Sequence, residues 1–165
     1  MVPALPCHPG ALTSLLSINT ETRILPATHQ PQRETQMAIQ VVNGAMLACT
    51  MGAAPSSLVV LPTNRTMAGG MPAATIMDFA PMVNIMPFGM CMSIANPTVA
   101  SATAAALGVL TPMPCIPATV APWVPGAPTV LLGSMPALDN NCKCMCAYAG
   151  VISVTVPGQV TVMVP

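Results

Sequence analysis

Residues 126–138 read "GAPTVLLGSMPAL", and this stretch contains a structural unit that recurs along the chain. Its apolar run, residues 129–132, lies between Pro128 and Gly133 and predicts a short strand that ends in a turn. A Met-Pro-Ala turn follows, and Asp139 comes shortly after it. Because proline cannot donate a hydrogen bond to a sheet, strands bounded in this way are short or lie at sheet edges.

Similar patterns occur on both sides of this stretch. Residues 54–62 ("APSSLVVLP") and 157–165 ("PGQVTVMVP") also place proline or glycine before an apolar strand, and residues 69–78 ("GGMPAATIMD") repeat the Met-Pro-Ala turn. Three similar strand units predict a mainly β domain with approximate threefold symmetry, and their irregular spacing is unlike that of a solenoid. Further strands are predicted at 39–42 and 151–156.

One short helix is predicted near residues 97–107. Asn96 is a favourable N-cap and Pro97 suits the first helical position, because its missing N–H would have no partner there. The residues from 99 to 107 are rich in alanine, and Gly108 supplies the C-terminal stop.

Residues 1–36 differ in composition from the rest of the chain. They contain both histidines, four of the charged side chains and no periodic pattern. We therefore expect a flexible N-terminal extension at 1–36 and a single domain at 37–165. Met37 opens the orderly pattern and is an alternative start of translation.

The charge of the chain excludes several classes of partner. The formal net charge is zero and only 5% of the residues are charged, whereas about 25% is typical of soluble domains. A nucleic-acid-binding face or a basic patch for anionic lipid therefore cannot be assembled. Closely spaced prolines also interrupt the long uncharged run between Phe79 and Leu138, so we expect no stable membrane insertion.

Residues 37–165 lack the groups that most enzymes use. They contain no histidine, so a cysteine nucleophile would have no imidazole base. Their two carboxylates, Asp78 and Asp139, are far apart in the sequence and do not form an acid–base pair of neighbours. The sequence therefore predicts a protein without catalytic activity.

The cysteines are the strongest chemical signal. Six of them follow Met37, and the run 142–146 ("CKCMC") would direct three sulfurs to one side of an extended strand. In a reducing cytosol such thiols favour a structural Zn²⁺ with four thiolate ligands, with iron or an iron–sulfur cluster as the alternative. Inert buried thiols and disulfide bonds remain open as other interpretations. The fifteen methionines fit core filling, although a zinc- or copper-handling protein would also be rich in Cys and Met.

Several motifs occur in an order that resembles a known family, the Cys-rich PAAR-like spike-tip proteins of type VI secretion and extracellular contractile injection systems. The motifs are "VVNGAMLACTMG", "PSSLVVLPTNR", "GGMPAATIMD", "PMVNIMPFGMC", "NPTVASATAAALGVLTPMPCIP", "PWVPGAPTVLLGSMPAL" and "KCMCAYAGVI". The resemblance extends over residues 37–165. It implies a PAAR-like β-cone with pseudo-threefold symmetry, built from short strands and loops.

The resemblance also implies a function. Such a cone caps and sharpens the blunt end of a trimeric VgrG-like spike, aids membrane piercing and carries effector cargo. It would assemble in the bacterial cytoplasm and leave with the particle tip, to the exterior or into a target cell. PAAR proteins bind metal with His and Cys, whereas this domain offers only thiolates, and the candidate ligands are Cys49, Cys115, Cys144, Cys146 and Cys91. A metal-handling protein, which binds zinc or copper without a trimeric partner, is the alternative function.

Overall fold

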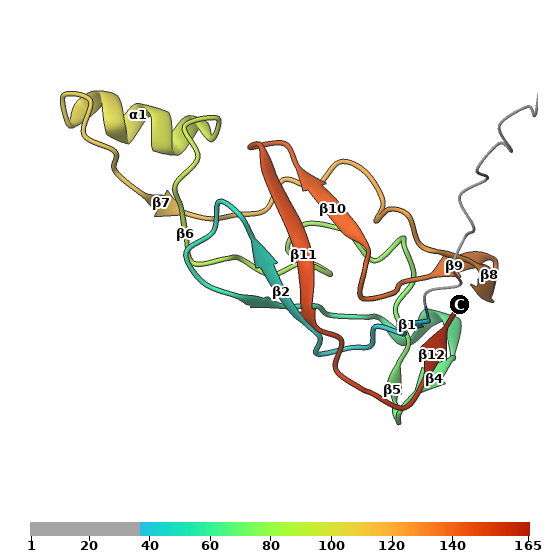
Figure 1. The fold of residues 1–165 in the computed structure, drawn as a ribbon. Helices are drawn as coiled ribbons and strands as arrows, with labels where there is room; N and C mark the ends of the chain where they lie inside the picture. Colours follow the sequence, from blue (N-terminus) through green and yellow to red (C-terminus); the bar gives the residue numbers. More distant parts are fainter. Residues whose placement is uncertain (1–36) are drawn as a thin grey trace, which may run out of the picture. The chain divides into compact units, whose positions relative to one another are not determined.

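The structure, a computed structural model, describes residues 37–165, and the extension predicted at 1–36 lies outside the described residues. The described part is mainly β with one α-helix, as predicted (Figure 1). The helical elements are η1 (Pro62–Asn64) and α1 (Pro97–Ala105). The strands are β1 (Ala38–Ile39), β2 (Met46–Cys49), β3 (Ser56–Ser57), β4 (Met67–Ala68), β5 (Met71–Pro72), β6 (Met90–Cys91), β7 (Met113–Pro114), β8 (Ala127–Leu132), β9 (Met135–Ala137), β10 (Lys143–Cys146), β11 (Gly150–Val156) and β12 (Met163–Val164).

The largest sheet is antiparallel, with the strand order β10-β11-β2-β3. Side chains alternate between buried and more exposed positions along β2 and β10, as expected for a sheet with one face on the core. Its buried face packs in the main hydrophobic core with Phe88 and Trp123, both fully buried. The indole N–H of Trp123 donates to the carbonyl oxygen of Asp78 at 2.9 Å, so this large side chain has no unpaired polar atom.

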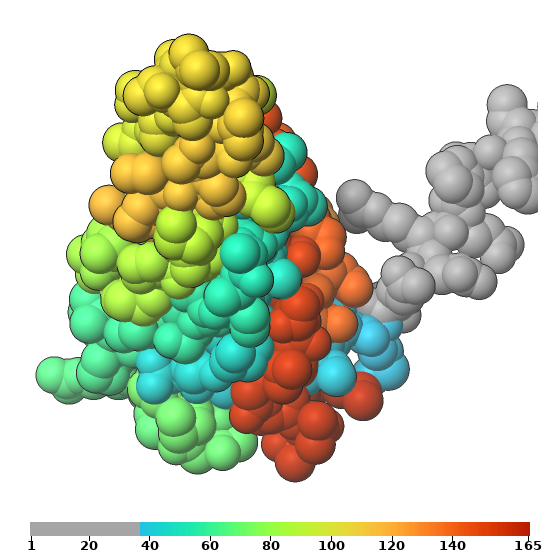
Figure 2. All heavy atoms as spheres, turned by 90° about the vertical axis from the view of Figure 1, so that its left-hand side faces the viewer, coloured from blue at the N-terminus to red at the C-terminus, as the bar shows by residue number. Residues whose placement is uncertain are grey.

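Helix α1 begins as predicted and ends slightly earlier. The side chain of Asn96 accepts a hydrogen bond from the N–H of Thr98, and Pro97 opens the helix. Leu107 and Gly108 both have positive φ after the end of α1, and this left-handed turn reverses the chain. Figure 2 shows that residues 37–165 narrow toward α1 and the loop that follows it. Among these residues no helix is long and apolar enough to cross a membrane.

The strand predicted within residues 54–62 is not formed as expected. Strand β3 covers only Ser56–Ser57, before the apolar run 58–61, and within that run only Leu58 makes a β-bridge, with Ile85. The backbone of Val59 is instead paired with Asn84, whose carbonyl oxygen accepts from the Val59 N–H and whose side chain donates to the Val59 carbonyl oxygen. The apolar run is therefore buried as an irregular segment, because an asparagine satisfies the backbone groups that a neighbouring strand would otherwise satisfy.

Three short antiparallel ladders lie together at the end of the described residues away from α1 (Figure 1). We call them arms. Arm 1 pairs β4 with β5, arm 2 pairs the end of β8 with β9, and arm 3 pairs β12 with β1. The three arms share one register: Met67↔Pro72 and Ala68↔Met71, Leu131↔Pro136 and Leu132↔Met135, and Met163↔Ile39 and Val164↔Ala38.

The three arms are joined by a closed ring of backbone hydrogen bonds, which we call the threefold ring. The N–H of Val41 donates to Leu138 at 2.9 Å, that of Leu138 to Ala74 at 3.0 Å, and that of Ala74 back to Val41 at 2.9 Å. All three residues are fully buried. Because each arm donates to one neighbour and accepts from the other, the backbone follows a cyclic threefold pattern.

The flanking contacts repeat the same pattern at each junction. In each arm, the residue two positions after the ring residue donates a backbone hydrogen bond to a neighbouring arm. These bonds run from the N–H of Asn43 to Pro72, from that of Ile76 to Pro136, and from that of Asn140 to Ile39. One β-bridge also forms at each junction: Val42↔Ala73, Thr75↔Ala137 and Gln40↔Asp139. The sequence therefore predicted the threefold character but not the correct units, since residues 69–78 supply an arm and residues 54–62 do not.

Candidate functional site

The arms present exposed apolar side chains at equivalent positions. Met67, Leu131 and Met163 occupy the same place in the three ladders, with exposed fractions of 57%, 58% and 53%. The next residue in each strand is buried in all three arms: Ala68, Leu132 and Val164. Met71 and Met135 add a further equivalent exposed pair. We call these five exposed residues the docking face. Pseudosymmetry places equivalent members at the same height along the threefold axis.

Arm 3 differs from the other two in how its strands are connected. In arm 1 the strands are joined by a tight turn at Gly69 and Gly70, whose positive φ angles suit a two-residue hairpin. In arm 3 the equivalent two positions are Pro165 and Met37, so the ladder is formed by segments from opposite ends of the described domain. The threefold pattern is thus completed by tertiary pairing and not by a local hairpin.

Four of the candidate metal ligands lie near one another in the main core, and we call Cys49, Cys91, Cys115 and Cys146 the thiol cluster. Cys49 lies opposite Ile152 in the ladder of β2 and β11, and Cys146 lies opposite Gly150 in the ladder of β10 and β11. Gly150 makes room for the Cys49 sulfur, which would be 2.7 Å from a Cβ atom at that glycine. All four side chains are buried.

Burial and neighbouring thiols raise the pKa of two members of the thiol cluster, Cys49 and Cys115. Burial raises the pKa of Cys49, and the thiols of Cys146 and Cys91 raise it further. Burial also raises the pKa of Cys115 to about 12, and the neighbouring thiols of Cys91 and Cys49 raise it further. At neutral pH such thiols behave as small apolar side chains with low nucleophilicity.

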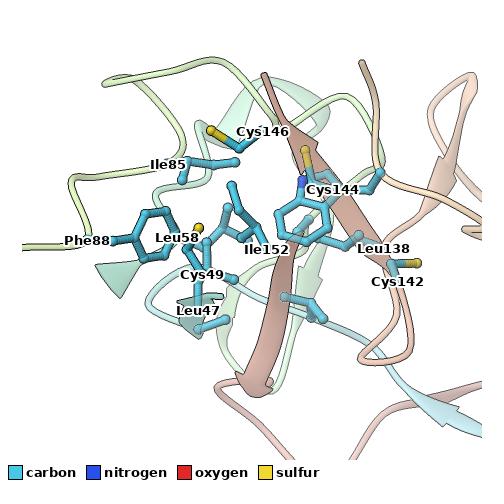
Figure 3. Close-up of a cluster of buried hydrophobic side chains, with 14 of the residues drawn as sticks. Leu47, Cys49, Leu58, Ile85, Phe88, Leu138, Cys142, Cys144, Cys146 and Ile152 are labelled. Atoms are coloured by element: carbon cyan, nitrogen blue, oxygen red, sulfur yellow. The ribbon is translucent and has the colours of Figure 1, made fainter. Parts of the chain in front are cut away.

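The two other cysteines of "CKCMC", Cys142 and Cys144, are also buried. Burial raises the pKa of Cys144 to about 11 and the neighbouring Cys146 thiol raises it further, while the Cys144 thiol donates to the carbonyl oxygen of Ala121 at 3.5 Å. Burial likewise raises the pKa of Cys142 to about 11, while its sulfur accepts a hydrogen bond from the N–H of Gly126 at 3.2 Å. In Figure 3, Cys142 lies apart from Cys49 and Cys146. Alternation in β10 places Cys144 and Cys146 on one buried side, as the sequence predicted, whereas Cys142 lies just before β10 and is buried separately.

The cysteines do not form a ready metal centre. Within residues 37–165 no three cysteine, histidine, aspartate or glutamate side chains are arranged so that they could hold a metal ion. The structure therefore shows no metal-holding group among the five candidate ligands, Cys49, Cys91, Cys115, Cys144 and Cys146. Metal binding stays a prediction from the sequence, and no step of the function is derived through a metal.

The two aspartates of the domain have roles in turns. The carboxylate of Asp78 accepts hydrogen bonds from the N–H of Thr75 at 2.7 Å and from its hydroxyl at 3.0 Å. Burial raises the pKa of Asp78, although the hydrogen bonds from Thr75 lower it. Asp139 accepts from the N–H of Asn141 at 2.7 Å. Both carboxylates thus order the chain just after an arm, as turn-forming Asp residues commonly do.

Comparison with protein families gives one match: residues 41–159 match the model described as "Domain of unknown function (DUF4280)". The chain belongs to the DUF4280 family. The matched region includes arms 1 and 2 and all six described cysteines, and it excludes both strands of arm 3, because β1 precedes it and β12 follows it. Neither the curated proteins nor the solved structures give a match to this chain.

Sequence reasoning missed arm 3 as a functional element. Its β1 strand lacks the Met-Pro-Ala motif that marks arms 1 and 2, so no local repeat identifies it. The sequence did predict strands at 39–42 and within 157–165, but their pairing with each other could not be recognised from spacing. The pairing of Val164 with Ala38 across the length of the domain required the tertiary structure.

Proposed function

We propose that residues 37–165 form the tip of a contractile injection machine and cap a trimeric VgrG-like spike. The observation that carries this proposal is the threefold ring of Val41, Ala74 and Leu138 in a single chain. A trimer presents three identical surfaces around its axis, and one chain can engage all three equally only if its own surface repeats three times. The family resemblance supplies the spike as the trimer.

The docking face supports the same proposal. Its equivalent members Met67, Leu131 and Met163 are apolar and exposed, and a protein partner would remove them from water. Methionine suits such a contact because its flexible thioether adapts to an imperfectly symmetric surface. Charge has little part in this recognition, since Arg65, Asp78, Asp139 and Lys143 are the only charged residues of the described domain.

The remainder of the proposed role follows from the position of α1. With the arms on the spike, α1 and its loop would form the leading end of the particle, which meets the target first. The protein would fold in the bacterial cytoplasm and leave the cell with the particle, together with any effector cargo. Piercing by such a tip needs rigidity and shape, and no chemical step is required of it.

The decisive experiment is a binding measurement with a purified trimeric VgrG-type spike. We expect native mass spectrometry to detect one chain per trimer. Met67→Glu, Leu131→Glu and Met163→Glu should each weaken the complex by roughly tenfold or more, because each buries an unpaired charge. Leu107→Glu is the matched control, since Leu107 is 96% exposed beside α1 and should leave affinity unchanged. Absence of any complex, or equal loss in the control, would contradict the proposal.

A further inference from the structure

The turn that follows α1 exposes three large apolar side chains within four consecutive residues. Residues 107–110 read Leu-Gly-Val-Leu, and we call them the apolar turn. Leu107, Val109 and Leu110 have exposed fractions of 96%, 68% and 46%, and Leu107 is the most exposed large apolar side chain of residues 37–165. The apolar turn lies at the end of the described domain away from the three arms, so it is a different surface from the docking face (Figure 1).

The backbone of the apolar turn holds these side chains away from the domain. Leu107 and Gly108 have φ angles of 54° and 90°, and this left-handed reversal carries the chain off the end of α1. A Cβ atom at Gly108 would meet no other atom within 4 Å, so the turn is open to its surroundings at this point. The exposure of the apolar side chains is therefore a consequence of the local backbone.

Most backbone donors of the apolar turn are paired within the chain. These bonds run from the N–H of Leu107 to Ala104 at 3.2 Å, from that of Gly108 to Thr103 at 2.9 Å, and from that of Val109 to Ala106 at 3.1 Å. Just after the turn, the N–H of Thr111 donates to the hydroxyl of Thr103 at 3.1 Å, and the hydroxyl of Thr111 donates to the Val109 carbonyl oxygen at 3.0 Å. Hydrocarbon offers no hydrogen bonds, so internal pairing of this kind lowers the cost of leaving water.

The charged side chains of the described domain all lie outside the segment that carries the apolar turn. Residues 79–138 contain no Asp, Glu, Lys, Arg or His. Arg65 precedes arm 1, Asp78 follows it, Asp139 follows arm 2, and Lys143 opens β10. Because an ion is costly to remove from water, a segment without charge is suited to an apolar environment.

We propose that the apolar turn inserts shallowly into a lipid bilayer, where the hydrocarbon beneath the headgroups receives Leu107, Val109 and Leu110. A protein partner fits this surface less well. A specific protein interface takes about 800 Å² from each partner and includes a polar rim with hydrogen bonds. The described domain is narrow at α1 and the loop that follows it, as Figure 2 shows. Lipid requires neither a matched shape nor hydrogen-bonding groups, and four residues are too few to span the bilayer.

The biological setting of this contact rests on the proposed function, in which α1 leads the particle toward its target. Insertion itself needs no spike, because the docking face and the apolar turn lie at different ends of the described domain. The isolated chain can therefore be tested with lipid alone. Loss of lipid binding and loss of spike binding are then separate results.

The test is flotation of the full chain with phosphatidylcholine vesicles. We expect the wild type to partition onto them, with little change on raising the salt concentration or adding phosphatidylglycerol, because no basic patch takes part. Leu107→Glu and Val109→Glu should each lower the partition coefficient by roughly tenfold or more. Val160→Glu is the matched control and should bind as the wild type does, since Val160 is 74% exposed but lies in the segment that leads to β12.

A fluorescent variant locates the contact directly. In Val109→Trp, the emission of the new indole should shift to shorter wavelength when vesicles are added, and brominated lipid should quench it. Trp123 gives a constant background because it is fully buried.

Four results would overturn the inference. They are no partition of the wild type, an equal loss in Val160→Glu, binding to anionic vesicles alone, and self-association without lipid binding that Leu107→Glu abolishes. The last result would assign the apolar turn to a second copy of the chain.

Discussion

The N–H of Ala74 donates a hydrogen bond to the carbonyl oxygen of Val41 over 2.9 Å, and this bond joins arm 1 to arm 3. The side chain of Gln40 donates to the same Val41 oxygen and to the Ala74 oxygen, each at 2.9 Å. The backbone is therefore threefold at this point while the side chains are not. A single long side chain covers ring carbonyls, and its equivalents in arms 1 and 2 are the small residues Ala73 and Ala137. Close packing near the axis explains this asymmetry, because three glutamines would compete for the same space.

Leu138 should be the most sensitive position of the threefold ring. It is fully buried, so Leu138→Ala leaves a cavity that the surrounding ring cannot fill. We expect the free energy of unfolding to fall by about 2–5 kcal/mol, measured by urea denaturation. Leu131→Ala in the same arm is the control, because Leu131 is largely exposed, and it should change stability by less than about 0.5 kcal/mol. Similar losses in both variants would argue against the ring as a structural centre.

Gly150 should tolerate no side chain while Cys49 is present. A Cβ atom at Gly150 would lie 2.7 Å from the Cys49 sulfur, in a sheet whose backbone cannot shift freely. We expect Gly150→Ala to cost about 1–3 kcal/mol in thermal or urea unfolding. In the Cys49→Ala background the same substitution should cost markedly less, since the clashing sulfur is gone. Additive losses in this double-mutant cycle would show that the two positions are not in contact.

The Asp78 carboxyl should make stability depend on pH. Burial raises its folded pKa above the ordinary value of 3.8, so the folded state binds the proton more tightly than the unfolded state. The contribution of the Asp78 carboxyl to the free energy of unfolding is fully present below pH 3.8 and is lost as the pH rises through the folded pKa. Urea unfolding at about pH 3 and about pH 7 should detect this loss in the wild type and a smaller one in Asp78→Asn.

Another aspartate supplies the control for this measurement. Asp139→Asn changes a carboxylate in arm 2 and leaves Asp78 with its Thr75 hydrogen bonds. The loss of stability attributed to Asp78 should therefore persist in Asp139→Asn. If the free energy of unfolding of Asp78→Asn depends on pH in the same way as that of the wild type, burial of this carboxyl does not contribute to the pH dependence.

The geometry of arm 3 predicts that the domain can be circularly permuted. Two glycines that join Val164 to Ala38 would reproduce the turn that Gly69 and Gly70 form in arm 1. We expect residues 38–164, joined in this way and opened between Gly69 and Gly70, to retain the circular dichroism spectrum of the unpermuted domain. The free energy of unfolding should stay within about 1–2 kcal/mol of that of the unpermuted domain.

A second permutation tests whether the position of the opening matters. Opening the same joined chain between Ile152 and Ser153 cuts β11, which pairs with both β10 and β2. Such a chain should lose cooperative unfolding, because the central strand of the largest sheet is interrupted. Equal stability of the two permuted chains would mean that opening the arm 1 turn and cutting β11 cost the same free energy, contrary to the structure.

Much of the local structure could be predicted from the sequence. The cap at Asn96, the turn at Gly133 and the extended "KCMC" strand depend on neighbours in the chain, and backbone sterics and side-chain hydrogen bonding fix such features within a few residues. The Met-Pro-Ala motif likewise identified two arms, because the same residues form the same ladder at each position. The mainly β character was predictable for the same reason.

Only the tertiary structure decided how the threefold pattern closes and which sulfurs lie together. Val164 pairs with Ala38, and the thiols of Cys91 and Cys49 raise the pKa of Cys115, although these residues are distant in sequence. Such contacts depend on the packing of the whole domain, which no local pattern encodes. The run 142–146 illustrates the limit: alternation buried Cys144 and Cys146, but packing placed Cys142 against Gly126 and Cys144 against Ala121, which are partners that spacing does not indicate.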